Sequence, residues 1–175
     1  MRVQVVYITV AVLLGGCASM VPETIRTAAP GNVQIAQVRD QPQQYLNATV
    51  RWGGKIVSTR NERDRTELEI VGRNLDSEGR PQTDDISQGR FLVNVQGFLD
   101  PTIYKPTRNV TVRGRIESFV DRSIEEYRYT YPVVVADTIH LWKSPPLPLA
   151  RRPYYYEPFY DPWRPWGWPY YRPWP

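Results

Sequence analysis

The sequence predicts an all-β protein, a small five- to six-stranded antiparallel barrel that lies between two ends of different composition. Three observations predict it. Hydropathy alternates with a period of two in five segments between residues 49 and 142. Glycines lie inside two of these segments, where a sheet that curls into a barrel needs them. An apolar run opens the chain, and residues 144–175 hold 10 of its 17 prolines. An open sandwich is the alternative fold.

The first sixteen residues have the layout of a bacterial signal peptide. Arg2 precedes an apolar run over residues 3–14, which is shorter than the roughly 20 residues that span a bilayer. The run ends in Leu14-Gly15-Gly16-Cys17, which resembles a lipobox cleaved between Gly16 and Cys17. The resemblance implies a diacylglycerol thioether and an N-acyl chain on Cys17, and Ala18 after the cysteine implies an outer-membrane address. A buried structural cysteine is the alternative.

Residues 17–31 are predicted to be a lipidated tether, because they contain two prolines and no sustained periodicity. A tether of this length reaches at most roughly 50 Å. Three acyl chains, at about 0.8 kcal/mol per buried CH₂, would hold it on a membrane permanently. After the tether we expect a short helix capped by Asn32 and a turn over residues 42–46.

Five strands are predicted, at residues 49–58, 65–72, 90–99, 108–118 and 127–142. The first strand aligns Val50, Trp52 and Ile56 on one face, and the others alternate in the same way. Gly53-Gly54 and Gly114 mark bends. Pro132 cannot donate a ladder hydrogen bond, so we expect a break or an edge position there. Five strands within residues 32–143 fit a barrel of the OB type.

The composition excludes several kinds of chemistry. One cysteine and one histidine leave no internal disulfide and no Cys-cluster zinc site, so His140 is predicted to be structural. The adjacent carboxylates at residues 84–85 and 125–126 do not form an acid/base pair, because neighbours on an extended chain point to opposite sides. We therefore predict no enzyme, no metal and no cofactor beyond the lipid on Cys17.

Nucleic acid is not predicted as a partner, although OB barrels often bind it on their second and third strands. Glu67 and Glu69 point outward from the second strand, and Asn94 and Gln96 from the third. A phosphate backbone would therefore meet the wrong charge on this face.

The C-terminal segment, residues 144–175, is predicted to be extended, with polyproline II character. It holds 11 of the 22 aromatic residues of the chain, together with four arginines. We predict an interaction surface whose candidate residues are Tyr154, Tyr155, Tyr156, Trp163, Trp166, Trp168 and Trp174. Three hypotheses stay open: contact with a membrane interface, docking on an envelope protein or glycan, and a cover over the barrel.

Several short stretches follow the lipobox at Cys17. They are Arg51-Trp52-Gly53-Gly54-Lys55-Ile56, Gly89-Arg90-Phe91, Gly97-Phe98-Leu99-Asp100-Pro101, Val110-Thr111-Val112-Arg113-Gly114, Tyr129-Thr130-Tyr131-Pro132-Val133 and Leu141-Trp142. Together, and in this order, they resemble the Slp family, the starvation-inducible outer-membrane lipoproteins. The resemblance covers about residues 17–143, so the C-terminal segment lies outside it. The resemblance implies a lipid anchor in the outer membrane and a link to starvation and stress, and it supplies no catalytic residues.

The sequence therefore predicts a non-enzymatic outer-membrane lipoprotein that acts in envelope maintenance by binding. One alternative is a barrel that binds or hydrolyses a small envelope ligand, in a pocket around Tyr104, Tyr127 and His140. Another is a structural lipoprotein whose C-terminal segment tethers it to peptidoglycan. Phe98 and Leu99 are predicted to plug one end of the barrel, with a docking loop as the alternative.

Overall fold

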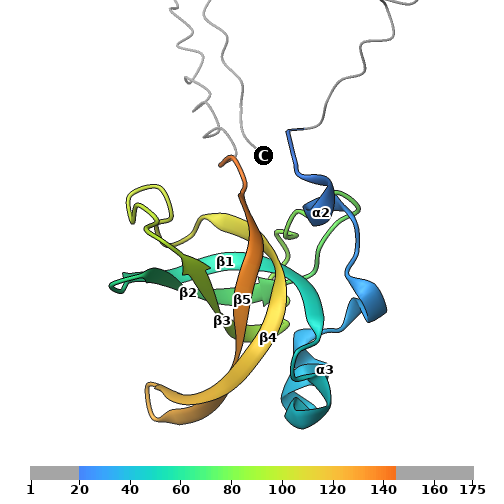
Figure 1. The fold of residues 1–175 in the computed structure, drawn as a ribbon, viewed down its shortest axis with the longest axis vertical. Helices are drawn as coiled ribbons and strands as arrows, with labels where there is room; N and C mark the ends of the chain where they lie inside the picture. Colours follow the sequence, from blue (N-terminus) through green and yellow to red (C-terminus); the bar gives the residue numbers. More distant parts are fainter. Residues whose placement is uncertain (1–19, 145–175) are drawn as a thin grey trace, which may run out of the picture. The chain divides into compact units, whose positions relative to one another are not determined.

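The structure is a computed structural model that describes residues 20–144 (Figure 1). The chain divides into two units, Met1–Ser144 and Pro145–Pro175. The predicted signal segment, Gly16, Cys17 and the aromatic candidates of the C-terminal segment all lie outside the described residues.

Five strands form a closed barrel in the order β1-β2-β3-β5-β4. They are β1 (Thr49–Asn61), β2 (Arg65–Arg73), β3 (Gly89–Gln96), β4 (Asn109–Ile124) and β5 (Tyr127–Leu141). The predicted OB-like barrel is confirmed, with one difference. The β3–β5 pair is parallel, from Leu92 opposite Val133 to Asn94 opposite Val135, and the other pairs are antiparallel. A closed ring with an odd number of strands cannot alternate direction throughout, so one parallel pair is obligatory.

Three strands differ clearly in length from the prediction, and β1 continues to Asn61, three residues beyond its predicted end. β3 ends at Gln96, earlier than predicted, because Gly97 has a φ of 86° and turns the chain. β4 continues to Ile124 and forms a long hairpin with β5. β5 does not break at Pro132. Its pairing with β3 starts one residue later, at Val133, so no hydrogen bond from an amide of residue 132 to β3 is required.

The barrel interior is filled with apolar side chains from all five strands. Trp52 meets Phe91 edge to face, with ring centroids 5.3 Å apart. The other buried members of this core are Ile35, Val38, Val50, Ile56, Leu68, Ile70, Val93, Val110, Val112, Ile116 and Val134. Gly54 and Gly114 are required where strands approach closely, because a Cβ would overlap the carbonyl oxygens of Val71 and Val135. The alternation predicted for the strands therefore identifies the core face correctly.

A short helix, α3 (Ile35–Asp40), contributes Ile35 and Val38 to this core. Its N-terminus is capped by Gln34, which forms a capping box with Gln37, and not by Asn32 as predicted. Asn32 instead ends a 3-10 turn, η2 (Pro30–Asn32). The predicted turn after the helix is the 3-10 segment η3 (Pro42–Tyr45).

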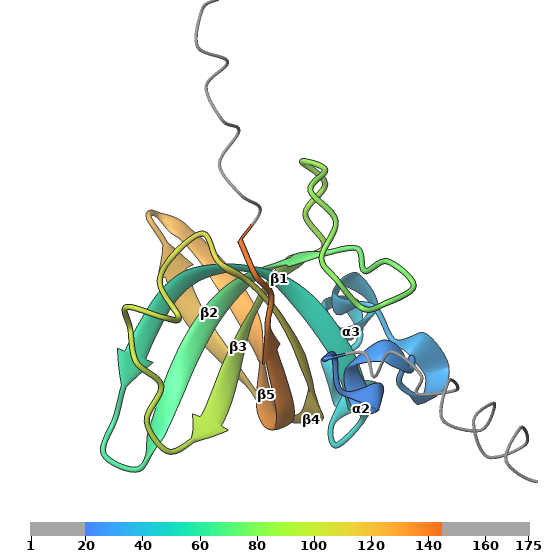
Figure 2. The ribbon, with the colours of Figure 1, turned by 90° about the horizontal axis from the view of Figure 1, so that it is seen from above.

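Residues 20–31 are packed on the barrel, contrary to their prediction as free tether. They include the helix α2 (Glu23–Arg26), whose Ile25 is fully buried. Arg51 of β1 holds this helix, because its Nη1 donates to the carbonyl oxygens of Ile25 at 2.9 Å and Arg26 at 2.6 Å. Figure 2 shows α2 and α3 on the same side of the barrel. Between Cys17 and the described domain only residues 18 and 19 remain.

Candidate functional site

The barrel interior holds no ligand chamber, because the apolar core fills it. The structure also separates the three residues predicted to line such a pocket. Tyr104 lies in the loop after β3 and packs against the core. Tyr127 starts β5 at the hairpin tip and is 66% exposed, whereas His140 lies near the opposite end of that strand. A catalytic or binding pocket made from these three side chains is therefore not formed.

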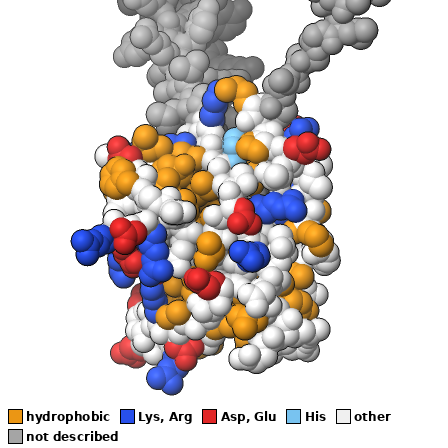
Figure 3. All heavy atoms as spheres, in the orientation of Figure 1, with side chains coloured by type: hydrophobic (Ala, Val, Ile, Leu, Met, Phe, Trp, Pro, Cys, Tyr) orange, Lys and Arg blue, Asp and Glu red, His pale blue; other side chains and the backbone are white. Residues whose placement is uncertain are grey.

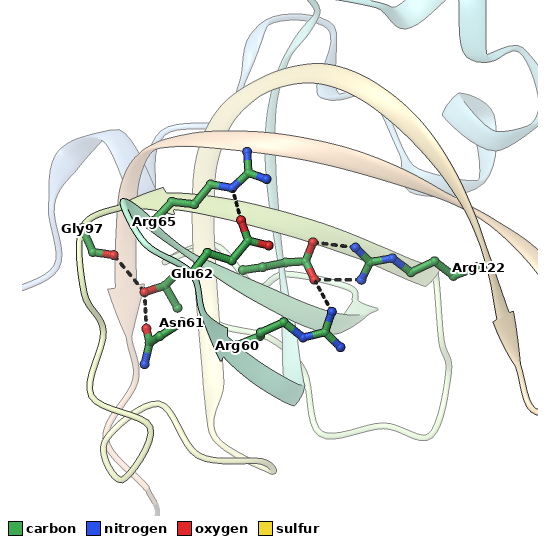
Figure 4. A network of polar contacts seen from close by, with 8 residues as sticks. Arg60, Asn61, Glu62, Arg65, Gly97 and Arg122 are labelled. Atoms are coloured by element: carbon green, nitrogen blue, oxygen red, sulfur yellow. Dashed lines mark hydrogen bonds and ion pairs between the residues drawn. The ribbon is translucent and has the colours of Figure 1, made fainter.

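The outer face of β2 carries an ion pair with the β4–β5 hairpin. Arg122 donates from Nη1 and Nη2 to the two carboxylate oxygens of Glu67, both at 2.7 Å (Figure 4). Arg60 approaches the same carboxylate to 4.0 Å. The hydrogen bonds from Arg122 lower the pKa of Glu67, and they outweigh the burial that acts in the opposite direction. Glu67 points outward as predicted, but it is only 8% exposed.

The neighbouring carboxylate is paired in a similar way. Glu69 accepts hydrogen bonds from Arg90 Nη1 at 2.7 Å and from the hydroxyl of Tyr131 at 3.0 Å. The hydroxyl of Tyr129 accepts a 2.6 Å hydrogen bond from the amide of Arg90. Leu92, Tyr129, Tyr131 and Val133 form a second buried cluster here. The part of the β2–β3 outer face that holds Glu67 and Glu69 is therefore occupied by side chains of the protein's own β4–β5 hairpin and of β3.

A second layer lies on the outside of β4 and β5. Trp142 is 3% exposed, and its Nε1 donates a 2.9 Å hydrogen bond to the hydroxyl of Thr111. That hydroxyl donates to the carbonyl oxygen of Gly79 at 2.6 Å. The guanidinium of Arg80 stacks over the Trp142 ring, 4.7 Å from its centroid. The loop between β2 and β3 is thus fastened to the end of β5.

An open groove of about 370 Å³ lies beside this layer, where the described chain begins and ends. We call it the end groove. Its lining residues are Met20, Val21, Arg80, His140, Leu141, Trp142 and Lys143. His140 meets Trp142 edge to face at 4.5 Å, and burial together with the charge of Arg80 lowers its pKa. In Figure 3 the histidine, in pale blue, lies among apolar side chains near the upper rim.

A polar cavity of about 340 Å³ lies between the start of α3, β1 and the loop after β2. Its polar lining residues are Asn32, Gln34, Arg51, Arg73, Asn74, Gln82 and Gln88. Arg51 Nε is buried there without a hydrogen-bond partner. Burial and the nearby charge of Arg113 lower the pKa of Arg51. Amide and guanidinium groups without a carboxylate suit a neutral or anionic polar molecule.

Both pockets were missed by sequence reasoning, because their walls come from segments far apart in the chain. The predicted plug at residues 98–99 is only half correct: Leu99 packs against the core, whereas Phe98 is 73% exposed. Within residues 20–144 no cluster of three or more metal-ligating side chains occurs. None of the short helices in that range has the length or apolarity to cross a bilayer.

These features define the class of protein as a small OB-like barrel with a filled interior. The start and the end of its described residues lie at one groove. A family model described as "Outer membrane lipoprotein Slp family" matches residues 14–174. The chain belongs to this family, and it is an outer-membrane lipoprotein. The match corrects the prediction that the C-terminal segment lies outside the family region, because the family model extends through it.

Two curated relatives from Escherichia coli K12 support the assignment. One, named "Uncharacterized lipoprotein YeaY", is 35% identical over 93% of this chain and 82% of its own length. The other, named "Outer membrane protein Slp", is 31% identical over 77% of this chain and 72% of its own length. A solved structure, a small single-stranded DNA-binding protein from Streptomyces coelicolor, covers 54% of this chain and 94% of its own at 21% identity. Its TM-score of 0.36 is too low to support an argument.

Proposed function

We propose that the protein is a non-catalytic binding lipoprotein that acts in envelope maintenance under starvation or stress. The observation that carries this proposal is the filled barrel, because the buried core of the described domain consists of apolar side chains and offers no catalytic group. The carboxylates on the outer face, Glu67 and Glu69, are engaged with arginines and a tyrosine. The link to starvation rests on the resemblance to the Slp family.

The anchor is the lipid on Cys17. We assign to this cysteine the diacylglycerol and the N-acyl chain, with cleavage after Gly16, because the lipobox ends where the apolar run stops. Membership of a lipoprotein family supports this assignment. The lipid is the only non-protein group that the proposal requires.

The C-terminal segment is the binding surface in this proposal, and the barrel is its mount. Aromatic and arginine side chains dominate the energetics of protein interfaces, and residues 144–175 are rich in both. Their partner is an envelope protein or peptidoglycan. The inclusion of this segment in the family match supports a role beyond that of a spacer.

In-cell crosslinking followed by purification tests the proposal. The full chain is compared with a chain that ends at Lys143, which keeps every strand of the barrel. A third chain keeps the segment but replaces Trp163, Trp166, Trp168 and Trp174 by alanine. We expect a partner or a cell-wall fragment on the full chain only. Capture of the same species by all three chains would show that the barrel carries recognition.

The polar cavity favours a second candidate function, the binding of a small polar envelope ligand. Its amide side chains and Arg51 could hydrogen-bond a sugar or a muropeptide. A ligand that binds only the folded state raises the unfolding temperature. Thermal unfolding in the presence of saccharides and muropeptides tests this function. A shift that is abolished by Gln82→Leu supports it, and an unchanged midpoint with every compound argues against it.

A further inference from the structure

The distance between the lipid anchor and the folded domain is set by two residues. Met20 is the first described residue, and it lines the end groove. Three residue steps from Cys17 to Met20 span at most about 11 Å. The packing of Ile25 and the hydrogen bonds from Arg51 hold residues 23–26 on the barrel, so these residues do not lengthen the tether. The end groove therefore lies within a short distance of the acyl chains, if Cys17 carries them as proposed.

The end groove and the loop beside it have the chemistry of a membrane-contacting surface. Met20 is 84% exposed and Ile103 is 50% exposed. The guanidinium of Arg108 brings Ile103 beside the end of β5, because it donates to the carbonyl oxygens of Ile103 at 3.4 Å and Trp142 at 3.0 Å. Exposed apolar side chains of this kind can insert between lipid headgroups.

The charged side chains that line the groove are positive, which is the sign that an anionic lipid surface attracts. The described residues that line it include Arg80 and Lys143 and no carboxylate. The hairpin tip between β4 and β5 carries Glu125 and Glu126, both exposed, beside the exposed Arg128. Figure 1 shows this hairpin at the opposite end of the barrel from the first and last described residues. Anionic headgroups attract lysine and arginine and repel carboxylates. The positive lining of the groove and the two glutamates of the hairpin tip therefore favour an orientation with the groove toward the membrane.

We propose that the end-groove face, with Met20 and Lys143 in the groove and Ile103 in the loop held beside the end of β5, lies against the leaflet that holds the acyl chains of Cys17. The β4–β5 hairpin then points away from the membrane. The inference deepens the proposed function, and it rests on the proposed lipid at Cys17. It also places the start of the C-terminal segment at the membrane surface, because Lys143 lines the groove. A partner of that segment is thus recognised close to the headgroups.

Site-specific fluorescence on the lipidated full chain tests the orientation. The sequence has a single cysteine, which the lipid would consume, so an introduced cysteine is the one free thiol. Ile103→Cys and Lys143→Cys report on the end-groove face, and Tyr127→Cys at the hairpin tip is the matched control. Each protein carries an environment-sensitive fluorophore and is reconstituted in vesicles of phosphatidylethanolamine and phosphatidylglycerol. Brominated lipids and aqueous iodide serve as quenchers.

We expect brominated lipid to quench at residues 103 and 143 at least twofold more than at residue 127, with the opposite order for iodide. Equal quenching at the three positions would overturn the proposal. Cooperative unfolding of each variant verifies its fold, and the two positions on the end-groove face act as independent checks. Intact mass shows whether Cys17 carries the lipid, so loss of the anchor is distinguished from a wrong orientation. A chain without lipid on Cys17 would overturn both the anchor and the orientation.

The competing occupant of the groove is the protein's own C-terminal segment. If that segment covers the groove, thiols at residues 103 and 143 react slowly in the full chain and at least tenfold faster in a chain that ends at Ser144. Such a result on the lipidated proteins would contradict membrane contact. Equal reactivity in both chains, together with strong lipid quenching, is the outcome that the proposal predicts.

Discussion

The indole of Trp142 and the hydroxyl of Thr111 are joined by a 2.9 Å hydrogen bond between two buried side chains. The hydroxyl of Thr111 in turn donates a 2.6 Å hydrogen bond to the carbonyl oxygen of Gly79. The pair therefore fastens the end of β5 and the loop after β2 to the same point on β4. It fixes the place from which the C-terminal segment leaves the domain.

Thr111→Val tests the strength of this connection. The substitution keeps the shape of the side chain but leaves the indole Nε1 and the carbonyl oxygen of Gly79 without a partner. A buried polar group without a partner costs about 1–3 kcal/mol, so we expect a loss of this size in the free energy of unfolding measured in urea. Thr130→Val, on the exposed hydrogen bond to Asp121, should change it by less than about 0.5 kcal/mol. Equal effects of the two substitutions would contradict the role of Thr111.

The Glu67–Arg122 pair should show strong coupling in a double-mutant cycle. Glu67→Gln and Arg122→Gln each break a bidentate ion pair in which the side chain of Glu67 is 10% exposed and that of Arg122 is 36% exposed. Because each single change removes the hydrogen-bonded partner of the other charge, we expect losses of about 1–3 kcal/mol, and a double variant less destabilised than their sum. Chemical unfolding of the four proteins gives the coupling energy. Strict additivity would show that the hairpin is held by the apolar cluster alone.

The same pair predicts a pH dependence of known sign. The pKa of Glu67 is lowered in the folded protein, so its contribution is complete above the ordinary value of 4.5. It is lost as the pH falls through the lower folded value. The stability difference between the natural chain and Glu67→Gln should therefore be constant from pH 7 to about 5 and shrink below pH 4.5. Unfolding curves at several pH values measure it, with the exposed Glu126→Gln as control. A difference that grows on acidification would refute this assignment.

Gly54→Ala should damage the barrel more than any exposed substitution in β1. The added methyl group would overlap the carbonyl oxygen of Val71, which belongs to the backbone of the adjacent strand and cannot rotate away. We expect a loss of about 3 kcal/mol or more, or failure to fold. Lys55→Ala, at the neighbouring exposed position, should be nearly neutral. Thermal unfolding of both variants decides the question, and a neutral Gly54→Ala would mean that the two strands can move apart.

The sequence was sufficient to predict the presence and the core face of the five strands, because their inner side chains alternate over most of each strand, although bulges interrupt β1 and β4. Val50, Trp52 and Ile56 all lie in the core as the alternation requires. The parallel β3–β5 pair could also have been predicted, since a closed ring of five strands cannot alternate throughout.

The packed N-terminal segment, the Glu67–Arg122 ion pair and the end groove could not be predicted, because no local sequence pattern indicates them. Ile25 is the one large apolar residue between Pro22 and Pro30, too little for a periodic pattern, yet it anchors the N-terminal segment. Glu67 looked like a solvated charge because its partner Arg122 lies 55 positions away. The end groove combines the first and last residues of the domain with Arg80, so only the three-dimensional fold brings them together.

The lipid on Cys17 is the central claim, because both the location and the orientation of the domain depend on it. Intact mass spectrometry of the protein purified from outer membranes tests it most directly, alongside fractionation of Cys17→Ala. The account predicts a chain that lacks residues 1–16 and carries a diacylglycerol and an N-acyl chain, together with a variant released from the membrane. An unmodified chain that begins at Met1, or a variant that still sediments fully with the outer membrane, would contradict it.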